Sequence, residues 1–174
     1  MAARTDVLDL GRLKLESGQG RRLDSFTVAL DPFGFGGQQY AAVDREIPVL
    51  LDISRMTAGG YSLRLRFEAE LSGPCMRCLT EARPSISVDS REIDQPGGGD
   101  ELSSPYMVDE ELDLQAWARD ALALALPAQI VCREDCAGLC PECGKDLNRE
   151  PHEHERPPDP RWAKLRDLGL QQGS

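Results

Sequence analysis

Two closely spaced cysteine pairs constrain this sequence more than any other feature. The first pair is Cys75-Met-Arg-Cys78, and the second is Cys140-Pro-Glu-Cys143, which Gly144 follows. A C-x2-C turn aims two sulfurs toward one point, and two such turns complete the four-sulfur shell that zinc prefers. The spacing therefore predicts a structural zinc ion. Its predicted ligands are Cys75, Cys78, Cys140 and Cys143.

The chain has six cysteines, so other ligand sets are open. Cys132 and Cys136 precede the second pair, and their spacing would allow a local site within residues 132–143. A mixed site would instead combine Cys132 and Cys136 with the first pair. His152 and His154 could replace one sulfur, although the acidic and proline-rich residues around them are typical of a solvated tail.

The composition adds reasons to expect a metal. Hydrophobic residues make up 40% of the chain and aromatic residues only 5%, which predicts a modest, aliphatic core. Structural zinc contributes roughly 10–16 kcal/mol of apparent binding energy in small peptides, so an ion would help such a core. The first ten residues show no export signal, and the apolar run 121–128 is too short to cross a bilayer. We therefore expect a cytoplasmic protein, in which clustered cysteines usually bind metal.

The charge limits the ways in which this chain could bind nucleic acid. The formal net charge is −10, which disfavours non-specific attraction to phosphate. Arg64, Arg66 and Arg77 are the candidates for a local patch that faces RNA. The alternative is that they pair with Glu68, Glu70 or acids on a neighbouring strand. Nothing in the sequence places a substrate beside those two glutamates, so a solvated strand face is favoured over general acid–base catalysis.

Alternating side chains predict the strands. Residues 61–72 alternate between apolar and polar with period two, and shorter stretches at 23–30, at 47–53 and around Val88 do the same. One apolar face and one polar face are typical of an antiparallel sheet. The first cysteine pair follows Gly73-Pro74, which places it at the tip of a hairpin. The segment 31–37, rich in glycine and phenylalanine, is expected to form a flexible turn.

One helix is predicted over about residues 112–126. Leu114, Trp117, Ala121 and Leu124 recur at helical spacing, and Pro127 ends the pattern. The acidic residues before the helix suit the positive end of its dipole.

The predicted fold class is α+β: an antiparallel, curled β-sheet packed by one main helix, with a Cys-rich zinc knuckle region and a flexible acidic C-terminal tail. Residues 1–174 are expected to form a single domain. Its expected parts are a weakly patterned N-terminus (about 1–20), a flexible loop (94–105), the Cys-rich segment (132–143) and a tail with a short terminal helix (149–174).

These motifs occur together in an order that resembles a known family. An alternating strand leads into Cys75-Met-Arg-Cys78, a helix ends at Pro127, the Cys-rich segment 132–143 follows, and Asp159-Pro-Arg-Trp-Ala-Lys-Leu165 comes last. This order closely resembles the YceD family of large ribosomal RNA subunit accumulation proteins. The resemblance runs from about residue 20 to the end and is most specific over 112–165. It implies a YceD-like domain with a role in the accumulation of large-subunit ribosomal RNA and no established enzymatic activity.

The predicted function is that of a bacterial, non-catalytic factor that supports large-subunit ribosomal RNA accumulation and ribosome assembly, with a structural zinc site. Its expected partner is a large-subunit ribosomal RNA precursor or a basic ribosomal protein, with no membrane and no small-molecule substrate; the acidic charge favours the protein. The alternative is a thiol-based redox sensor or holdase in which oxidation expels the metal. A zinc hydrolase is disfavoured, because an all-sulfur shell leaves no open position for water.

Overall fold

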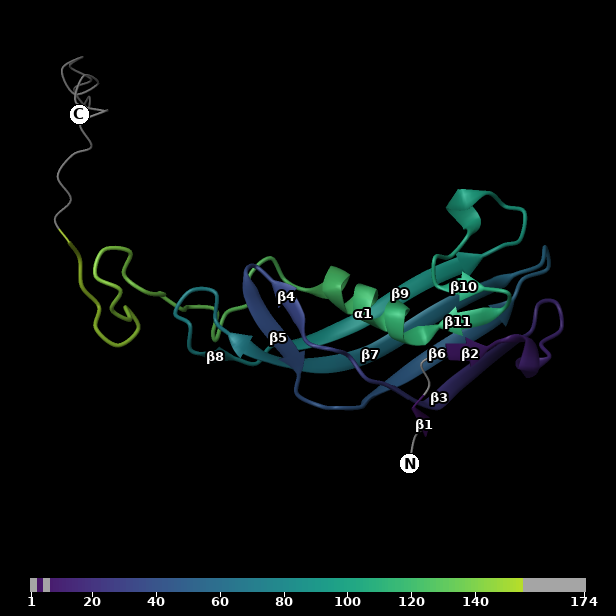
Figure 1. Cartoon of the computed structure of the whole chain (residues 1–174), viewed down its shortest axis with the longest axis horizontal. Helices are drawn as coiled ribbons and strands as arrows, with labels where there is room; N and C mark the ends of the chain where they lie inside the picture. The colour runs from purple at the N-terminus through teal and green to yellow at the C-terminus, as the bar shows by residue number, and fades with distance from the viewer. Residues whose placement is uncertain (1–2, 5–6, 155–174) are drawn as a thin grey trace, which may run out of the picture. The chain divides into compact units, whose positions relative to one another are not determined.

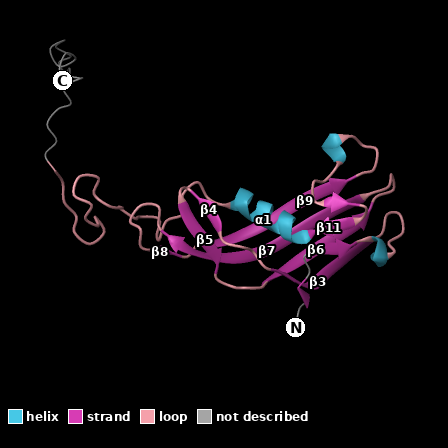
Figure 2. Ribbon diagram, viewed as in Figure 1, coloured by secondary structure: helices cyan, strands magenta, loops and turns pink. Residues whose placement is uncertain are grey.

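The computed structural model describes residues 3–4 and 7–154. The chain divides into two compact units, residues 1–136 and 137–174, and each is described by itself. Every helix and strand of the described residues belongs to the first unit (Figures 1 and 2). None of the helices in this part of the chain has the length and apolar character needed to span a membrane.

A large sheet forms the first unit, with β7 at its centre. β7 pairs with β6 along one edge and with β9 along the other, both antiparallel, while β3 lies beyond β6. β1 adds a parallel strand beside β3, and β8 pairs with the end of β7. The strand bounds are β1 Ala3–Arg4, β3 Gly20–Val28, β6 Ile47–Arg55, β7 Tyr61–Pro74, β8 Glu81–Ala82 and β9 Ser85–Asp94.

Residues 31–37 contribute to a hairpin, so the turn predicted over this segment narrows to Gly36 and Gly37, while Phe33 packs against the core and the predicted flexibility stays a prediction. β4 (Phe33–Phe35) and β5 (Gln38–Ala42) pair across a two-residue connection. Gly36 and Gly37 fill it with φ values of 57° and 78°. Two positive φ angles match the twist of a tight hairpin, and glycine adopts them without strain. β5 then continues beside the end of β7.

A second, three-stranded antiparallel sheet is formed by segments whose sequence pattern is weak. Its strands are β2 (Val7–Asp9), β10 (Met107–Val108) and β11 (Glu111–Asp113). Two short 3-10 turns accompany it, η1 (Gly11–Leu13) and η2 (Asp100–Leu102). The predicted loop 94–105 therefore contains one helical turn, and its flexibility stays a prediction.

The helix α1 (Leu114–Ala125) lies where the sequence predicts it. It begins at Asp113, whose carboxylate accepts a hydrogen bond from the Ala116 amide at 2.9 Å. Trp117 is buried against the sheet and donates through Nε1 to Ser90 Oγ at 3.0 Å. Leu124 was expected on the apolar face but is 87% exposed. At 100° per residue, Leu124 falls about 20° beyond Trp117, at the margin of the buried face.

The core lies between the sheet and α1. The predicted alternation in β7 is confirmed, because each apolar side chain of its first eleven residues is at most 6% exposed. Those side chains are Tyr61, Leu63, Leu65, Phe67, Ala69 and Leu71. The opposite face of the sheet carries the charged residues of the pattern and is solvated.

The predicted class, an antiparallel β structure with one main helix, is confirmed, but the predicted curl is wrong. Among the described strands, β9 pairs only with β7 and β1 only with β3, so the sheet stays open (Figure 2). The helix α1 covers the apolar face of this open sheet. The predicted terminal helix and most of the predicted tail fall within 155–174, outside the described residues.

Candidate metal centre

The structure gathers the cysteines into two separate groups. The four-cysteine cluster lies within the first unit, and the cysteine–histidine cluster lies within the second. In each cluster the four ligand atoms lie within 4.8 Å of one another. The four-cysteine cluster comprises Cys75, Cys78, Cys132 and Cys136. The cysteine–histidine cluster comprises Cys140, Cys143, His152 and His154.

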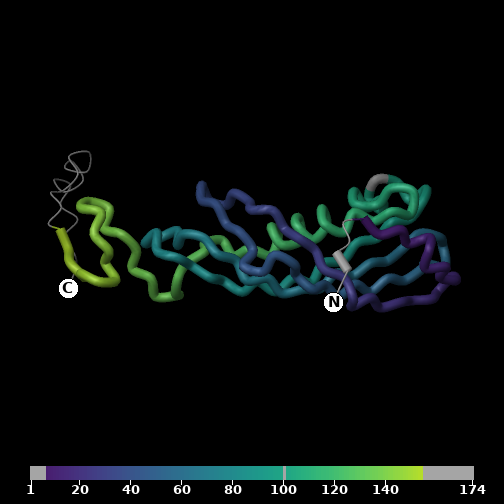
Figure 3. Tube along the Cα trace, turned by 60° about the horizontal axis from the view of Figure 1, so that its bottom comes forward, coloured from purple at the N-terminus to yellow at the C-terminus, as the bar shows by residue number. Residues whose placement is uncertain are grey.

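The turn that carries the first cysteine pair is held at the end of β7. The Cys75 amide donates to Thr80 O at 2.7 Å, and the Leu79 amide donates to Cys75 O at 3.0 Å. The Met76 amide donates to Ile130 O at 2.9 Å, which ties the turn to the segment after α1. Both views of the chain show these two segments side by side (Figures 1 and 3). This contact brings Cys132 and Cys136 within reach of the first pair.

The sulfur positions of the four-cysteine cluster fit a tetrahedral metal. Cys75 Sγ lies 3.9 Å from Cys136 Sγ, and Cys78 Sγ lies 3.6 Å from Cys132 Sγ. A zinc ion at about 2.3 Å from each sulfur sets the corners of a tetrahedron about 3.8 Å apart. A disulfide needs about 2.05 Å, and all six cysteines are free. The donor set and its spacing therefore suit zinc.

The surroundings of the first pair favour thiolates. Burial raises the pKa of the Cys75 thiol, but backbone N–H groups of Cys78, Arg77 and Cys132 outweigh it and lower that pKa to about 6. The Thr80 hydroxyl, 3.0 Å from Cys78 Sγ, lowers the pKa of that thiol as well. Because metals bind the deprotonated sulfur, these contacts prepare the first pair for an ion, whereas burial raises the pKa of the Cys132 thiol to about 11.

Arg77, a predicted RNA contact, is engaged within the same cluster. Its guanidinium donates to Cys136 O at 3.1 Å and to Gln129 Oε1 at 3.1 and 3.2 Å. The side chain therefore braces the segment that carries Cys132 and Cys136. A contact between Arg77 and RNA stays a prediction.

The cysteine–histidine cluster is arranged around the second C-x2-C turn. Backbone N–H groups of Cys143 and Glu142 lower the pKa of the Cys140 thiol to about 6. His152 donates from Nδ1 to Glu150 O at 2.7 Å and brings Nε2 to 3.1 Å from Cys143 Sγ. Both clusters could bind a metal ion such as zinc.

The predicted ligand set takes one cysteine pair from each unit, and it stays a prediction. The structure groups the first pair with Cys132 and Cys136, a mixed set that the sequence left open. It groups the second pair with both histidines, which the sequence interpretation assigned to a solvated tail. The spacing C-x2-C-x8-H-x-H is the signal that could have identified this second set.

Arg64 and Arg66, the other predicted RNA contacts, lie on the polar face of the sheet in ion pairs. Arg64 Nε donates to Asp89 Oδ1 at 2.7 Å. Arg66 donates to Asp52, which also accepts from Arg22 Nε at 2.6 Å. Acids on neighbouring strands thus compensate both cations, and a role in binding RNA stays a prediction.

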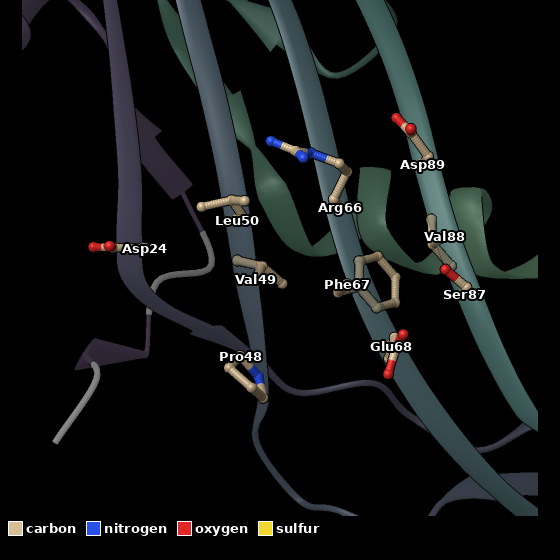
Figure 4. Close-up of a pocket in the computed structure, with 10 residues that line it drawn as sticks. All are labelled: Asp24, Pro48, Val49, Leu50, Arg66, Phe67, Glu68, Ser87, Val88 and Asp89. Atoms are coloured by element: carbon tan, nitrogen blue, oxygen red, sulfur yellow. The ribbon is translucent and has the colours of Figure 1, made fainter.

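A shallow depression crosses this polar face (Figure 4). Arg66 and Asp89 lie at one part of it and Glu68 and Ser87 at another, above Phe67 of the core. Glu68 is exposed there, as expected for a solvated strand face.

One family model matches the chain, and its curated relatives are uncharacterized proteins. A sequence model of the large ribosomal RNA subunit accumulation protein YceD matches residues 63–169, which include both clusters and α1. Uncharacterized proteins of Mycobacterium tuberculosis and Mycobacterium bovis are each 37% identical over 142 residues, covering 76% of this chain and 67% of the relative. One of Mycobacterium leprae is 38% identical over 101 residues, covering 54% of this chain and 46% of the relative. No solved structure matches the chain. Because the family match covers more than half of the chain, this protein belongs to the YceD family of large ribosomal RNA subunit accumulation proteins.

Proposed function

We propose that this chain is a non-catalytic factor that supports the accumulation of large-subunit ribosomal RNA during ribosome assembly. The observation that carries the proposal is the family match over residues 63–169. The family's description names an effect on the large ribosomal RNA subunit, and the matched segment contains the helix and every cysteine of the chain.

In this proposal the four-cysteine cluster holds a structural zinc ion. Four thiolates fill a tetrahedral shell, and a closed shell is typical of structural rather than catalytic zinc. The cluster links the end of β7 to the segment that follows α1. An ion bound there would therefore fix the last part of the first unit to its sheet.

The proposed partner is a basic ribosomal protein, as part of a large-subunit precursor. The net charge of −10 would attract a basic surface. Two of the three candidate arginines are paired with aspartates, which weakens the case for a direct contact with RNA. An acidic protein can bring a basic ribosomal protein to its RNA without binding phosphate itself.

Depletion of the protein, followed by sucrose-gradient analysis, tests the proposed role. We expect less large-subunit ribosomal RNA, a smaller large-subunit peak, and the protein itself in fractions that contain large-subunit precursors. Unchanged ribosomal RNA and unchanged subunit profiles would contradict the proposal. Cross-linking in those fractions tests the partner. A cross-linked complex with a ribosomal protein keeps its size after ribonuclease treatment, whereas a cross-linked complex with RNA becomes smaller.

A thiol-based redox switch is the second candidate, because each cluster presents an exposed cysteine. Cys132 and Cys143 are both exposed, while Cys75, Cys78, Cys136 and Cys140 are buried. In a switch, peroxide would oxidise a pair of thiolates to a disulfide and release the metal, and a thiol reductant would restore both. Zinc release that is reversible under mild peroxide favours this candidate. Resistance to peroxide, or irreversible loss of the metal, favours a purely structural role.

A further inference from the structure

The second unit contains a compact set of metal donors that is independent of the four-cysteine cluster. We propose that residues 137–154 fold around a second zinc ion, bound by the cysteine–histidine cluster. The proposal does not rest on the ribosomal role, and it implies two zinc ions per chain rather than the one that the cysteine spacing alone predicts.

A short hairpin holds the two cysteines of this site. Leu139 and Asp146 form an isolated antiparallel bridge, and the Leu147 amide donates to Gly138 O at 2.9 Å. The Cys140 amide donates to Lys145 O at 2.8 Å, which closes the loop that contains the C-x2-C turn. A hairpin of this kind presents both sulfurs from one turn, a ligand spacing typical of structural zinc sites.

Gly144 completes the turn after the second cysteine. Its φ is +71°, a left-handed conformation that glycine adopts readily, and its amide donates to Cys140 O at 2.9 Å. The sharp exit at Gly144 lets the chain return so that Asp146 pairs with Leu139.

His152 has the hydrogen-bonding pattern of a metal ligand. Its Nδ1 faces a backbone carbonyl, Glu150 O, at 2.7 Å, and a carbonyl can only accept, so Nδ1 carries a proton. In the neutral ring this leaves the lone pair on Nε2, which lies 3.1 Å from Cys143 Sγ. Metal-bound histidines usually donate their other ring nitrogen to a carbonyl or carboxylate in this way.

His154 provides the fourth donor beside His152. The two rings lie 5.0 Å apart and nearly perpendicular, at 86°. His154 Nδ1 lies 3.5 Å from Glu142 Oε2. A carboxylate is a common outer partner of a metal-bound histidine.

The second unit has little else to hold it together. Among residues 137–154, Cys140 is the one buried apolar side chain, while Leu139 and Leu147 are half-buried. A segment this small without a core usually needs a metal or a disulfide to fold. The four donors lie together in a segment with almost no buried apolar side chains, so a bound ion would stabilise this unit in place of a hydrophobic core.

Zinc content of the reduced full chain, measured by mass spectrometry, tests the proposal. We expect two zinc ions per chain in the wild type and one in each of C140S, C143S and H152A. The variants C75S and C136S should also retain one, and C75S combined with C140S should retain none. E153Q is the matched control: it changes an exposed side chain between the two histidines and should retain two ions. H152C should restore the second ion, because sulfur can take the place of the ring nitrogen.

Cobalt substitution identifies the ligands of each site. Cobalt bound to C75S should show weaker thiolate-to-metal absorption than cobalt bound to C140S. The cluster left intact in C75S offers two thiolates, and the cluster left intact in C140S offers four. One zinc ion per chain, lost equally in C75S and C140S, would overturn the proposal in favour of a site shared by the two pairs. Two ions retained in H152A would also overturn it. Amide exchange in β7 checks that each variant keeps the folded sheet. Zinc lost because a variant misfolds is thereby distinguished from zinc lost because a ligand is removed.

Discussion

The two units surround the same kind of metal donor very differently. In the first unit, three cysteines of the four-cysteine cluster are buried, and the cluster lies beyond the end of β7, whose alternate side chains form the core. In the second unit, Cys143 and His154 are exposed, and Cys140 is the one buried apolar side chain among residues 137–154.

Ligand chemistry alone therefore does not determine what an ion contributes to the stability of a fold. The sheet and α1 already exclude water from a continuous aliphatic core, so an ion in the four-cysteine cluster adds a link to an existing structure. In the second unit the ion would take the place of a core. The two clusters should therefore respond differently when metal is removed.

Metal removal should produce the largest contrast between the units. We expect a strong chelator to abolish amide protection at Cys140, Gly144 and Leu147, whose amides are hydrogen-bonded within the hairpin, while β7 stays protected. The reason is that structural zinc carries roughly 10–16 kcal/mol of apparent binding energy in small units, which is their whole stability. Hydrogen exchange read by mass spectrometry or NMR measures this.

Added zinc should restore the protection, whereas magnesium, which prefers oxygen ligands, should not. If residues 137–154 kept their protection in chelator, the contrast between the two units would be lost.

A core substitution tests the metal-independent stability of the first unit. Leu122 is 1% exposed and Leu124 is 87% exposed on the same helix. We expect Leu122→Ala to lower the free energy of unfolding by about 2–5 kcal/mol, because it leaves a cavity. Leu124→Ala should change it by no more than about 0.5 kcal/mol. Urea denaturation followed by circular dichroism, with and without chelator, measures both.

The loss in Leu122→Ala should be similar in both conditions. If Leu122→Ala lowered the free energy of unfolding only with metal bound, the core of the first unit would depend on the ion, and the two units would not differ in this respect.

The parts of the fold that the sequence predicts best are those in which burial has a simple period. β7 alternates along its length, and α1 begins at a capping aspartate, so both elements lie where expected. The β4–β5 hairpin was missed because it depends on positive φ angles at Gly36 and Gly37, which a glycine-rich segment permits but does not require. Leu124 was predicted to be buried because its helical spacing matches that of Trp117, but spacing does not show how far the contact between the helix and the sheet extends.

The metal ligands could be predicted as residues but not as sets. A C-x2-C turn fixes two sulfurs, and its partners depend on tertiary contacts. For the first pair that contact is the hydrogen bond from Met76 N to Ile130 O. For the second pair, the spacing C-x2-C-x8-H-x-H indicates the histidines, but the hydrogen bond that orients His152 on the carbonyl of Glu150 is visible only in the structure.

Arg77 offers a way to weaken the four-cysteine cluster without touching a ligand. We expect Arg77→Ala to lower the zinc affinity of this cluster by about 10–100-fold, as loss of supporting hydrogen bonds does in other metal sites. Arg77→Lys should lose most of the same affinity, because one ammonium group cannot bridge Gln129 Oε1 and Cys136 O as the guanidinium does. Competition with a coloured chelator, in a C140S/C143S background that removes the second site, measures the affinity.

Arg91→Ala, an exposed arginine on β9, is the control and should bind zinc normally. If Arg77→Lys bound zinc as tightly as the wild type, positive charge rather than hydrogen bonding would support the cluster.

The smallest expected effect concerns the polar face of the sheet, which is stabilised without metal. Asp52 accepts hydrogen bonds from Arg22 and Arg66, and these arginines lower the pKa of its carboxyl group. We expect Asp52→Asn to lower the free energy of unfolding by about 1–2 kcal/mol at pH 7. Asp24→Asn, at an exposed carboxylate on β3, should cost no more than about 0.5 kcal/mol.

The pH dependence separates the charge of Asp52 from its packing. Because the folded-state pKa of Asp52 lies below the unfolded value of about 3.9, its contribution is complete above that value and is lost as the pH falls through the folded-state pKa. The difference between wild type and Asp52→Asn should therefore shrink at the acidic end of a urea series run in chelator. If the difference in the free energy of unfolding were equal at pH 7 and in acid, the carboxamide would disturb packing. The contribution of Asp52 would then come from packing rather than from its charge. A difference that shrinks as expected in metal-free protein would show that the first unit keeps its ion pairs and its core when both clusters are empty. The second unit should not stay folded under the same conditions.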